Sequence, residues 1–323
     1  MNRVLVIRGG AIGDFILTLP ALKALRDAHP HTHIEILGYK HIAVLAENRF
    51  YAQAVRSIEY GPLSTFFAKN AELPSELAIY FANFDLIVSY LYDPDGIFES
   101  NLRRCGVELL IRGPAKPEKG EHAARQFARP LQELGLAVED LAAKVYPSIE
   151  DRHHAQEFLR DLPQPLVVFH PGSGSKKKTW PLENWIDIGN DLLGSDDFQG
   201  SLIIVLGEAD DDQVRSLRAI WKNERVQFAK HFPLPELAAV FEHSVFIGHD
   251  SGISHLAAAA SADCILLFGP SDPEGWAPLN ENVQIIRGGD GKIDNIEVAA
   301  VEEAMAPLVG RDRRARRVRE LET

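Results

Sequence analysis

The chain has 323 residues, of which 46% are hydrophobic and 25% are charged, a composition that excludes large-scale disorder. A chain of this length exceeds the size at which one hydrophobic core usually stops growing, so two domains are expected. The net charge of −12 argues against nucleic acid as the main partner. The two cysteines, Cys105 and Cys264, show no metal-binding or disulfide spacing, and there is no apolar run of about 18 residues and no signal-peptide pattern. A cytoplasmic protein is therefore expected.

Short apolar runs recur along the chain between stretches of helical spacing. Runs that are continuous rather than alternating predict strands buried on both faces of a parallel sheet. The predicted strands are 4–7, 34–37, 85–90, 166–169, 201–206, 244–248 and 264–268. Helices are predicted at 21–28, 185–193 and 234–241. The alternation predicts an α/β fold throughout.

The segment 161–165, Asp-Leu-Pro-Gln-Pro, is the predicted domain boundary, because two prolines in three residues cannot continue a helix and stand just before a new strand. The predicted domains are 1–162 and 163–323. Each opens with a strand followed by a glycine-rich turn, at 9–13 and at 172–174. This repetition predicts two Rossmann-like domains whose parallel sheets face each other across a central cleft, with both turns beyond the carboxyl ends of the strands.

The first glycine turn does not fit a dinucleotide-binding fingerprint. The spacing from Gly10 to Gly13 is too short, and Asp14 would repel a pyrophosphate. One interpretation of Asp14 is a carboxylate at a helix start, which the helix dipole stabilises by roughly 0.3–1 kcal/mol. Pro20 predicts either a kink or a helix that starts only near Thr18, which would leave Gly13 and Asp14 in the turn itself, aimed at the cleft.

The second glycine turn lies in the stretch FHPGSGSKKKTWPLENW, residues 169–185. The backbone amides of 172–175, with Gly172, Ser173 and Ser175, and one lysine of 176–178 can hold a diphosphate. The GxxxxGK[ST] spacing of a Walker A loop is absent, which argues against a hydrolysing NTPase. The remaining lysines are expected to be solvated.

The third stretch, 246–273, places the turn Asp250-Ser251-Gly252 between a strand and an alanine-rich helix. The free amides of the helix N-terminus form an anion site, to which Ser251 can add a hydroxyl donor. The alternative is that Asp250 or Ser251 is only an N-cap. A further glycine turn, 268–273, follows the next strand and is expected alongside, which favours a ligand site.

Together the stretches 4–25, 170–185 and 248–273 resemble glycosyltransferase family 9, the heptosyltransferases that build the lipopolysaccharide inner core. Their order and spacing cover essentially the whole chain. The resemblance implies a GT-B fold and an inverting glycosyltransferase that uses no metal and no other cofactor. It also implies a nucleotide-sugar donor, ADP-heptose, bound mainly by domain 163–323, and an acceptor bound by domain 1–162.

The resemblance assigns residues by position. Asp14 matches the catalytic base, Lys178 the phosphate-binding lysine, and Asp250, Ser251 and Gly252 the diphosphate loop. Lys176 and Lys177 remain alternatives to Lys178, because the loop before them is longer than in the inner-core enzymes by about a residue. Among the acidic residues of 208–212 we favour Asp211 for the ribose. Gly13 and His255 complete the predicted substrate contacts, although structural hydrogen bonding is the alternative role for His255 and also for His170.

The expected acceptor is a glycolipid or an oligosaccharide, bound by loops within 38–70 and 91–103, where Tyr90, Tyr92, Asp93 and Asp95 are candidates. The tail Arg311–Arg319 holds six arginines, which predicts either peripheral contact with the inner face of the cytoplasmic membrane or a solvated chain end. Two alternative functions are a GT-B transferase or epimerase that uses another donor, such as a UDP-sugar, and a non-catalytic nucleotide-binding protein.

Overall fold

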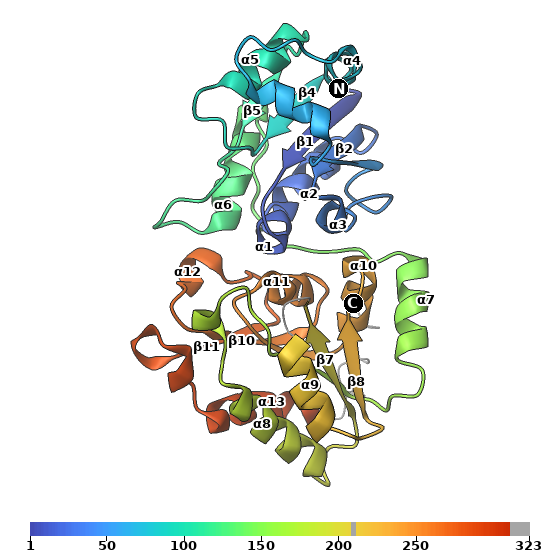
Figure 1. Cartoon of the computed structure of the whole chain (residues 1–323), viewed down its shortest axis with the longest axis vertical. Coiled ribbons are helices and arrows are strands. Elements are labelled where there is room, and N and C mark those ends of the chain that lie inside the picture. Colours follow the sequence, from blue (N-terminus) through green and yellow to red (C-terminus); the bar gives the residue numbers. More distant parts are fainter. Residues whose placement is uncertain (208–210, 311–323) are drawn as a thin grey trace. The chain divides into compact units, whose positions relative to one another are not determined.

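The computed structural model describes residues 1–207 and 211–310, which fall into two compact units (Figure 1). Unit 1 comprises Met1–Ala155, Pro233–Ala239 and Glu274–Asn280. Unit 2 comprises Gln156–Phe232, Val240–Pro273 and the chain from Glu281 onward. The predicted Arg311–Arg319 tail and residues 208–210 lie outside the described residues.

Unit 1 is built on a parallel sheet with the strand order β3-β2-β1-β4-β5. The strands are β1 (Arg3–Arg8), β2 (His33–Gly38), β3 (Ala54–Ser57), β4 (Leu86–Ser89) and β5 (Leu110–Arg112). The chain runs outward from β1 to β3 on one side and then from β4 to β5 on the other, so the strand order reverses between β1 and β4.

Helices follow the strands of unit 1, and an aromatic-rich core with Phe66, Phe81 and Phe98 packs against β1 and β4. The helices and 3-10 turns, up to the segment that leads into unit 2, are α1 (Ile12–Ile16), α2 (Leu19–Ala28), α3 (Lys40–Ala43), η1 (Gly61–Phe67), α4 (Ser75–Ala82), α5 (Ile97–Arg104), α6 (Ala123–Ala128), η2 (Arg129–Leu134) and α7 (Ile149–Phe158).

Unit 2 has a parallel sheet of six strands in the order β11-β10-β9-β6-β7-β8, and here the order reverses between β6 and β9. The strands are β6 (Leu166–His170), β7 (Ser201–Leu206), β8 (Val226–Lys230), β9 (Val245–His249), β10 (Asp263–Phe268) and β11 (Val283–Arg287). The helical elements in this part of the chain are η3 (Lys176–Lys178), α8 (Leu182–Gly194), α9 (Asp211–Ile220), α10 (Leu234–Phe241), α11 (Gly252–Ala259), α12 (Pro273–Trp276), η5 (Gly289–Gly291), η6 (Ile293–Asn295) and α13 (Val298–Val309). Of these, most of α10 and of α12 belongs to unit 1.

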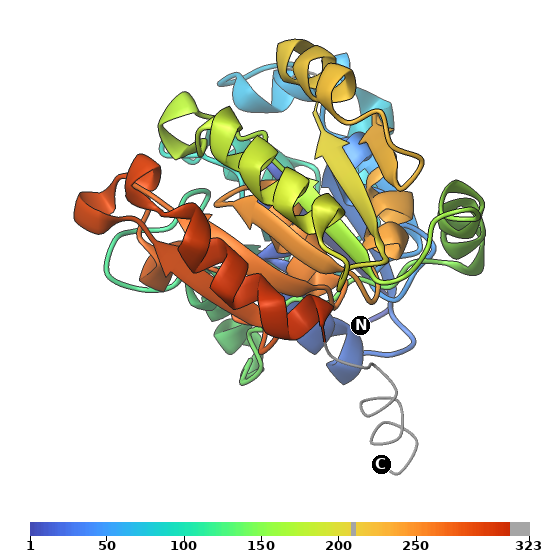
Figure 2. The ribbon, with the colours of Figure 1, turned by 90° about the horizontal axis from the view of Figure 1, so that it is seen from below.

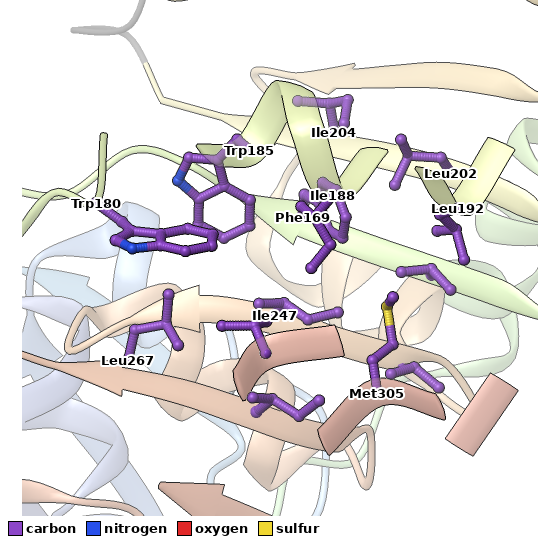
Figure 3. Packing of buried hydrophobic residues seen from close by; sticks show 14 of the residues in the cluster. Phe169, Trp180, Trp185, Ile188, Leu192, Leu202, Ile204, Ile247, Leu267 and Met305 are labelled. Carbon is purple, nitrogen blue, oxygen red and sulfur yellow. The ribbon is translucent and has the colours of Figure 1, made fainter. Parts of the chain in front are cut away.

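Helices α8 and α13 lie side by side over one face of this sheet (Figure 2). Between them and the sheet lies a core that contains two fully buried tryptophans, Trp180 and Trp185, whose rings meet edge to face at 5.4 Å (Figure 3). The Trp180 indole also donates to Ile296 O at 2.9 Å. The burial of Trp180 anchors the far end of the loop that follows β6.

The structure confirms the α/β class, the seven predicted strands and the three predicted helices. Four strands were not predicted, namely β3, β5, β8 and β11. The cleft between the sheets and the boundary after residue 162 stay predictions. No helix of the described part of the chain is long and apolar enough to cross a membrane.

The prediction for residues 13–20 was partly wrong. Thr18 is the N-cap of α2, with Pro20 in its first turn, as one alternative predicted. However, Gly13 and Asp14 lie within the short helix α1 and not in an open turn. The reason is a local cap, because the Asp14 carboxylate accepts the Ala11 N–H at 2.9 Å.

Candidate active site

Both sheets have a point where the strand order reverses, which is where open parallel sheets bind ligands, beyond the carboxyl ends of the strands. In unit 2 the flanking strands β6 and β9 end at His170 and His249. In unit 1 the flanking strands β1 and β4 end at Arg8 and Ser89. The predicted site residues follow the ends of β6 and β9 in unit 2 and the end of β1 in unit 1, except Asp211, which follows β7.

In unit 2 an ion pair joins the two predicted phosphate-binding stretches. Lys178 Nζ lies 2.5 Å from Asp250 Oδ2, and the Lys178 N–H donates to Ser175 O at 2.9 Å. The Asp250 side chain is only 11% exposed and that of Lys178 35%, whereas Lys176 and Lys177 are exposed. Of the three lysines, Lys178 is therefore the one that the structure brings to the turn after β9.

The turn after β9 leads directly into α11. Ser251 Oγ accepts the Ser254 N–H at 3.3 Å, so Ser251 is the N-cap of α11. The Ser254 hydroxyl in turn donates to His249 O. Ser251 and Gly252 remain partly exposed, and the first amides of α11 have no intrahelical acceptor because of their position. Ser251 can therefore cap α11 while the other amides of the same helix end remain available to an anion.

The loop between β6 and α8 is held by His249, whose side chain is fully buried. Its Nδ1 lies 3.1 Å from Gly172 O, and its Nε2 accepts the Trp180 N–H at 2.9 Å. Burial lowers the pKa of this imidazole to about 3, so it is neutral at the pH of a cell. Sequence reasoning assigned no role to His249, and its only signal was a histidine directly before the predicted turn.

The other residues that were predicted to contact the donor lie in the loop after β6, in α11 and in α9. Ser173 Oγ accepts the Ser175 N–H at 3.4 Å, and Ser175 O accepts the Thr179 hydroxyl at 3.1 Å. His255 is buried in the first turn of α11. Asp211 is the first residue of α9, and its side chain lies outside what the structure describes.

In unit 1 the candidate base Asp14 lies beside a buried cation. Arg8 is 2% exposed, and its Nη2 lies 3.1 Å from Asp14 O and 3.6 Å from Asp14 Oδ1. The rings of Phe127 and Tyr90 cover the guanidinium, with centroids at 4.2 Å and 5.5 Å. Burial lowers the pKa of Arg8 and the Asp14 carboxylate raises it, so the group stays a cation at neutral pH. Sequence reasoning missed Arg8.

The predicted acceptor candidates separate into two kinds. Tyr90 is buried and donates to Phe127 O at 2.7 Å, and the Asp93 carboxylate accepts two amides at the start of α5, so both have structural roles. Tyr92 and Asp95 are exposed, Tyr92 by 77%. Gly9 lies beside Leu91, where an added Cβ would be 3.6 Å from Leu91 Cδ2. The loops after β1 and β4 are therefore neighbours.

No group of three or more His, Cys, Asp or Glu side chains is arranged to hold a metal ion within residues 1–207 and 211–310. Lys178 and the N-terminus of α11 bring positive charge to the ends of β6 and β9. Such donors can stabilise a diphosphate leaving group by fixed electrostatics.

The model of the family "Glycosyltransferase family 9 (heptosyltransferase)" matches residues 104–305, more than half of the chain. Lipopolysaccharide heptosyltransferase 1 of Escherichia coli K12 is 24% identical over 95% of this chain and 100% of its own. A family 9 glycosyl transferase structure from Veillonella parvula superposes with a TM-score of 0.78, at 21% identity over 95% of this chain and 97% of that one. The structure of E. coli ADP-heptose lps heptosyltransferase II superposes with a TM-score of 0.74, at 15% identity over 96% of this chain and 98% of that one.

Proposed function

The chain belongs to glycosyltransferase family 9, and from this premise we propose that it transfers heptose from ADP-heptose to a hydroxyl of a lipopolysaccharide core or related glycan. The proposed reaction is one displacement with inversion and without a metal ion. The donor is assigned to domain 163–323 and the acceptor to domain 1–162. The observation that carries the proposal is the Lys178–Asp250 pair, which stands at the strand-order reversal of unit 2.

In the donor site, the Lys178 ammonium and the first amides of α11 bind the diphosphate. The Lys178 ammonium has three N–H donors, so it can bind a phosphate oxygen while it keeps its bond to the mostly buried Asp250 carboxylate. Asp250 thus acts as the group that keeps the ammonium at the end of β9. When the bond between the anomeric carbon and the phosphate oxygen breaks, the electron pair stays on ADP, where these donors stabilise it.

In the acceptor site, the Asp14 carboxylate takes the proton of the attacking hydroxyl while the acceptor oxygen bonds to the anomeric carbon. Such a base must be ionised near neutral pH. Arg8 supports this role because its buried guanidinium lies 3.6 Å from Oδ1 and holds the carboxylate in place. The Arg8 bond to Asp14 O also fixes the backbone that carries the carboxylate.

The choice of ADP-heptose follows the relatives, because one solved neighbour is an ADP-heptose lps heptosyltransferase. A thermal-shift series with ADP, UDP and GDP tests the base, and ADP is expected to raise the melting temperature most. Transfer is then measured with ADP-heptose and a heptose-deficient core acceptor, and the anomeric configuration of the product is read by NMR. Retention of configuration, or stabilisation by UDP alone, would contradict the proposal.

For the tail at 311–319 we propose contact with anionic lipid, since six arginines in an enzyme that acts on a glycolipid favour a membrane surface. Pelleting with vesicles that contain phosphatidylglycerol, with and without residues 311–323, measures this. Equal recovery of the two forms would refute the contact.

A further inference from the structure

His249 is a buried imidazole that uses both of its nitrogens on one loop. Because Gly172 O can only accept and the Trp180 N–H can only donate, Nδ1 carries the proton and Nε2 is the free lone pair. The environment therefore fixes one neutral tautomer. The Trp185 ring also packs edge to face against the imidazole, with the ring centroids 5.4 Å apart, and restricts its orientation.

Gly172 O and the Trp180 N–H, the two groups bonded to His249, stand at the start and at the end of the segment 172–180, which follows β6. Between them lie the partly exposed Ser173, Ser175 and Lys178, the residues that we assign to phosphate. Gly172 and Trp180 are buried, so both ends of the segment are fixed while the residues between them reach solvent.

The next residue of β9 completes the arrangement. Asp250 holds Lys178, so two consecutive residues, 249 and 250, contact the loop at three points. These contacts require β6 and β9 to be adjacent, which the pairing of His170 with Gly248 establishes.

We propose that His249 is the positioning residue of the donor-phosphate loop: it holds the amides of 172–175 and Lys178 in the phosphate-binding arrangement before the donor arrives. The inference rests on the proposed function, because it takes the loop to bind the diphosphate. A loop that is already ordered loses less conformational freedom on binding, and its donors bind phosphate more tightly for that reason.

Two variants of the full-length chain separate the two bonds. In His249→Asn the amide nitrogen takes the place of Nδ1 and keeps the donation to Gly172 O. In His249→Gln the amide oxygen takes the place of Nε2 and keeps the acceptance from the Trp180 N–H. Each variant therefore loses one attachment of the loop and retains the other.

The measurement is calorimetric binding of ADP and, by competition, of adenosine. We expect each variant to raise the Kd for ADP about fivefold, as the loss of one hydrogen bond does, and to leave adenosine within twofold. An equal loss of affinity for ADP and for adenosine, or no loss of affinity for either ligand, would overturn the proposal. UDP and uridine replace them if wild type binds only the uridine nucleotide.

The matched control is Trp221→Phe, which removes a part-buried side-chain hydrogen bond to Asn190 at 2.9 Å from a core residue of the same unit. It is expected to lower stability without changing the ratio of ADP to adenosine affinity. If Trp221→Phe changes that ratio as much as the His249 variants, the effect is one of general stability and the inference is wrong.

Lys178→Met distinguishes this inference from the proposed function. If Lys178→Met, Lys176→Met and Lys177→Met all leave ADP affinity unchanged, the donor site itself is misplaced. If Lys178→Met weakens ADP binding while both His249 variants bind it normally, the donor site stands and only the positioning role fails.

Discussion

Arg8 Nη2 lies 3.6 Å from Asp14 Oδ1 and 3.1 Å from the Asp14 main-chain oxygen, so a buried cation contacts both the side chain and the backbone of the candidate base. The rings of Phe127 and Tyr90 keep water from the guanidinium. Charge–charge interactions are stronger where water is excluded, and the Arg8–Asp14 pair is therefore the feature of unit 1 whose removal should be most visible in the rate of transfer.

Replacing Asp14 with Asn should abolish transfer without affecting the donor site. The amide can still accept the Ala11 N–H but cannot take a proton, so kcat should fall by roughly 10²–10⁴-fold. The Kd of ADP should be unchanged in calorimetry. Asp27→Asn is the control, because Asp27 is a half-exposed carboxylate paired with Lys23 on α2. Wild-type turnover in Asp14→Asn would remove this residue from the mechanism.

Replacing Arg8 with Met should lower the rate of transfer. Met keeps apolar contact with Phe127 and Tyr90 but removes the bond to the Asp14 main-chain oxygen and the charge beside the Asp14 carboxylate, so kcat should fall by about tenfold. Arg8→Lys retains the charge and should recover part of the rate. A wild-type kcat in a folded Arg8→Met would show that the pair is only structural.

Among the three consecutive lysines, only the change at 178 should weaken the nucleotide. Lys178→Met removes a charge-assisted bond and is expected to raise the Kd of ADP by roughly 10–100-fold. Lys176→Met and Lys177→Met, which remove exposed ammonium groups, are the controls and should stay within twofold. A larger loss at 176 or 177 would transfer the phosphate contact to that residue.

The stability of unit 2 should depend on pH through His249. Its pKa is about 3 in the folded chain, against 6.5 as the ordinary value, because burial, with a smaller effect from His170, lowers it more than the bond to Gly172 O and the Asp250 charge raise it. The unfolded chain binds the extra proton first, so the stabilisation is complete above pH 6.5 and is lost as the pH falls toward 3. In this range the free energy of unfolding should fall by up to about 1.4 kcal/mol per pH unit.

This linkage can be measured as a difference between wild type and His249→Gln, which does not titrate. Urea unfolding is followed by tryptophan fluorescence, to which Trp180, Trp185 and Trp221 of unit 2 contribute. The gap in the free energy of unfolding should narrow between pH 6.5 and pH 4.5. A constant gap would show that the imidazole is not held neutral by the fold.

The central strands of both sheets could be predicted from sequence, and the edge strands could not. The four missed strands, β3, β5, β8 and β11, are the outer strands of the two sheets. They carry Arg56, Arg112, Lys230 and Arg287, and much of β11 is exposed. Charged residues on exposed edges discourage pairing with another chain, and they also interrupt the continuous apolar pattern that predicts a strand.

The candidate site shows the same limit. Lys178 and the turn at 250–252 were both assigned to the diphosphate from sequence, and the structure places Lys178 Nζ 2.5 Å from Asp250 Oδ2. Arg8 and His249 gave no such signal. Their burial depends on Phe127 and on the loop ends at Gly172 and Trp180, which are distant in sequence and are brought near only by the fold.

The chain passes between the two units after Ala155, Phe232, Ala239, Pro273 and Asn280. An expressed fragment 1–162 would therefore lack the partners of His122 and Ala143, which contact Ala277 and Asn280 at 2.8 Å and 2.9 Å. A chimera that exchanges acceptor specificity between family members would need to graft three pieces of chain, Met1–Ala155, Pro233–Ala239 and Glu274–Asn280. Hybrid enzymes joined at a single crossover would carry mismatched packing in unit 1.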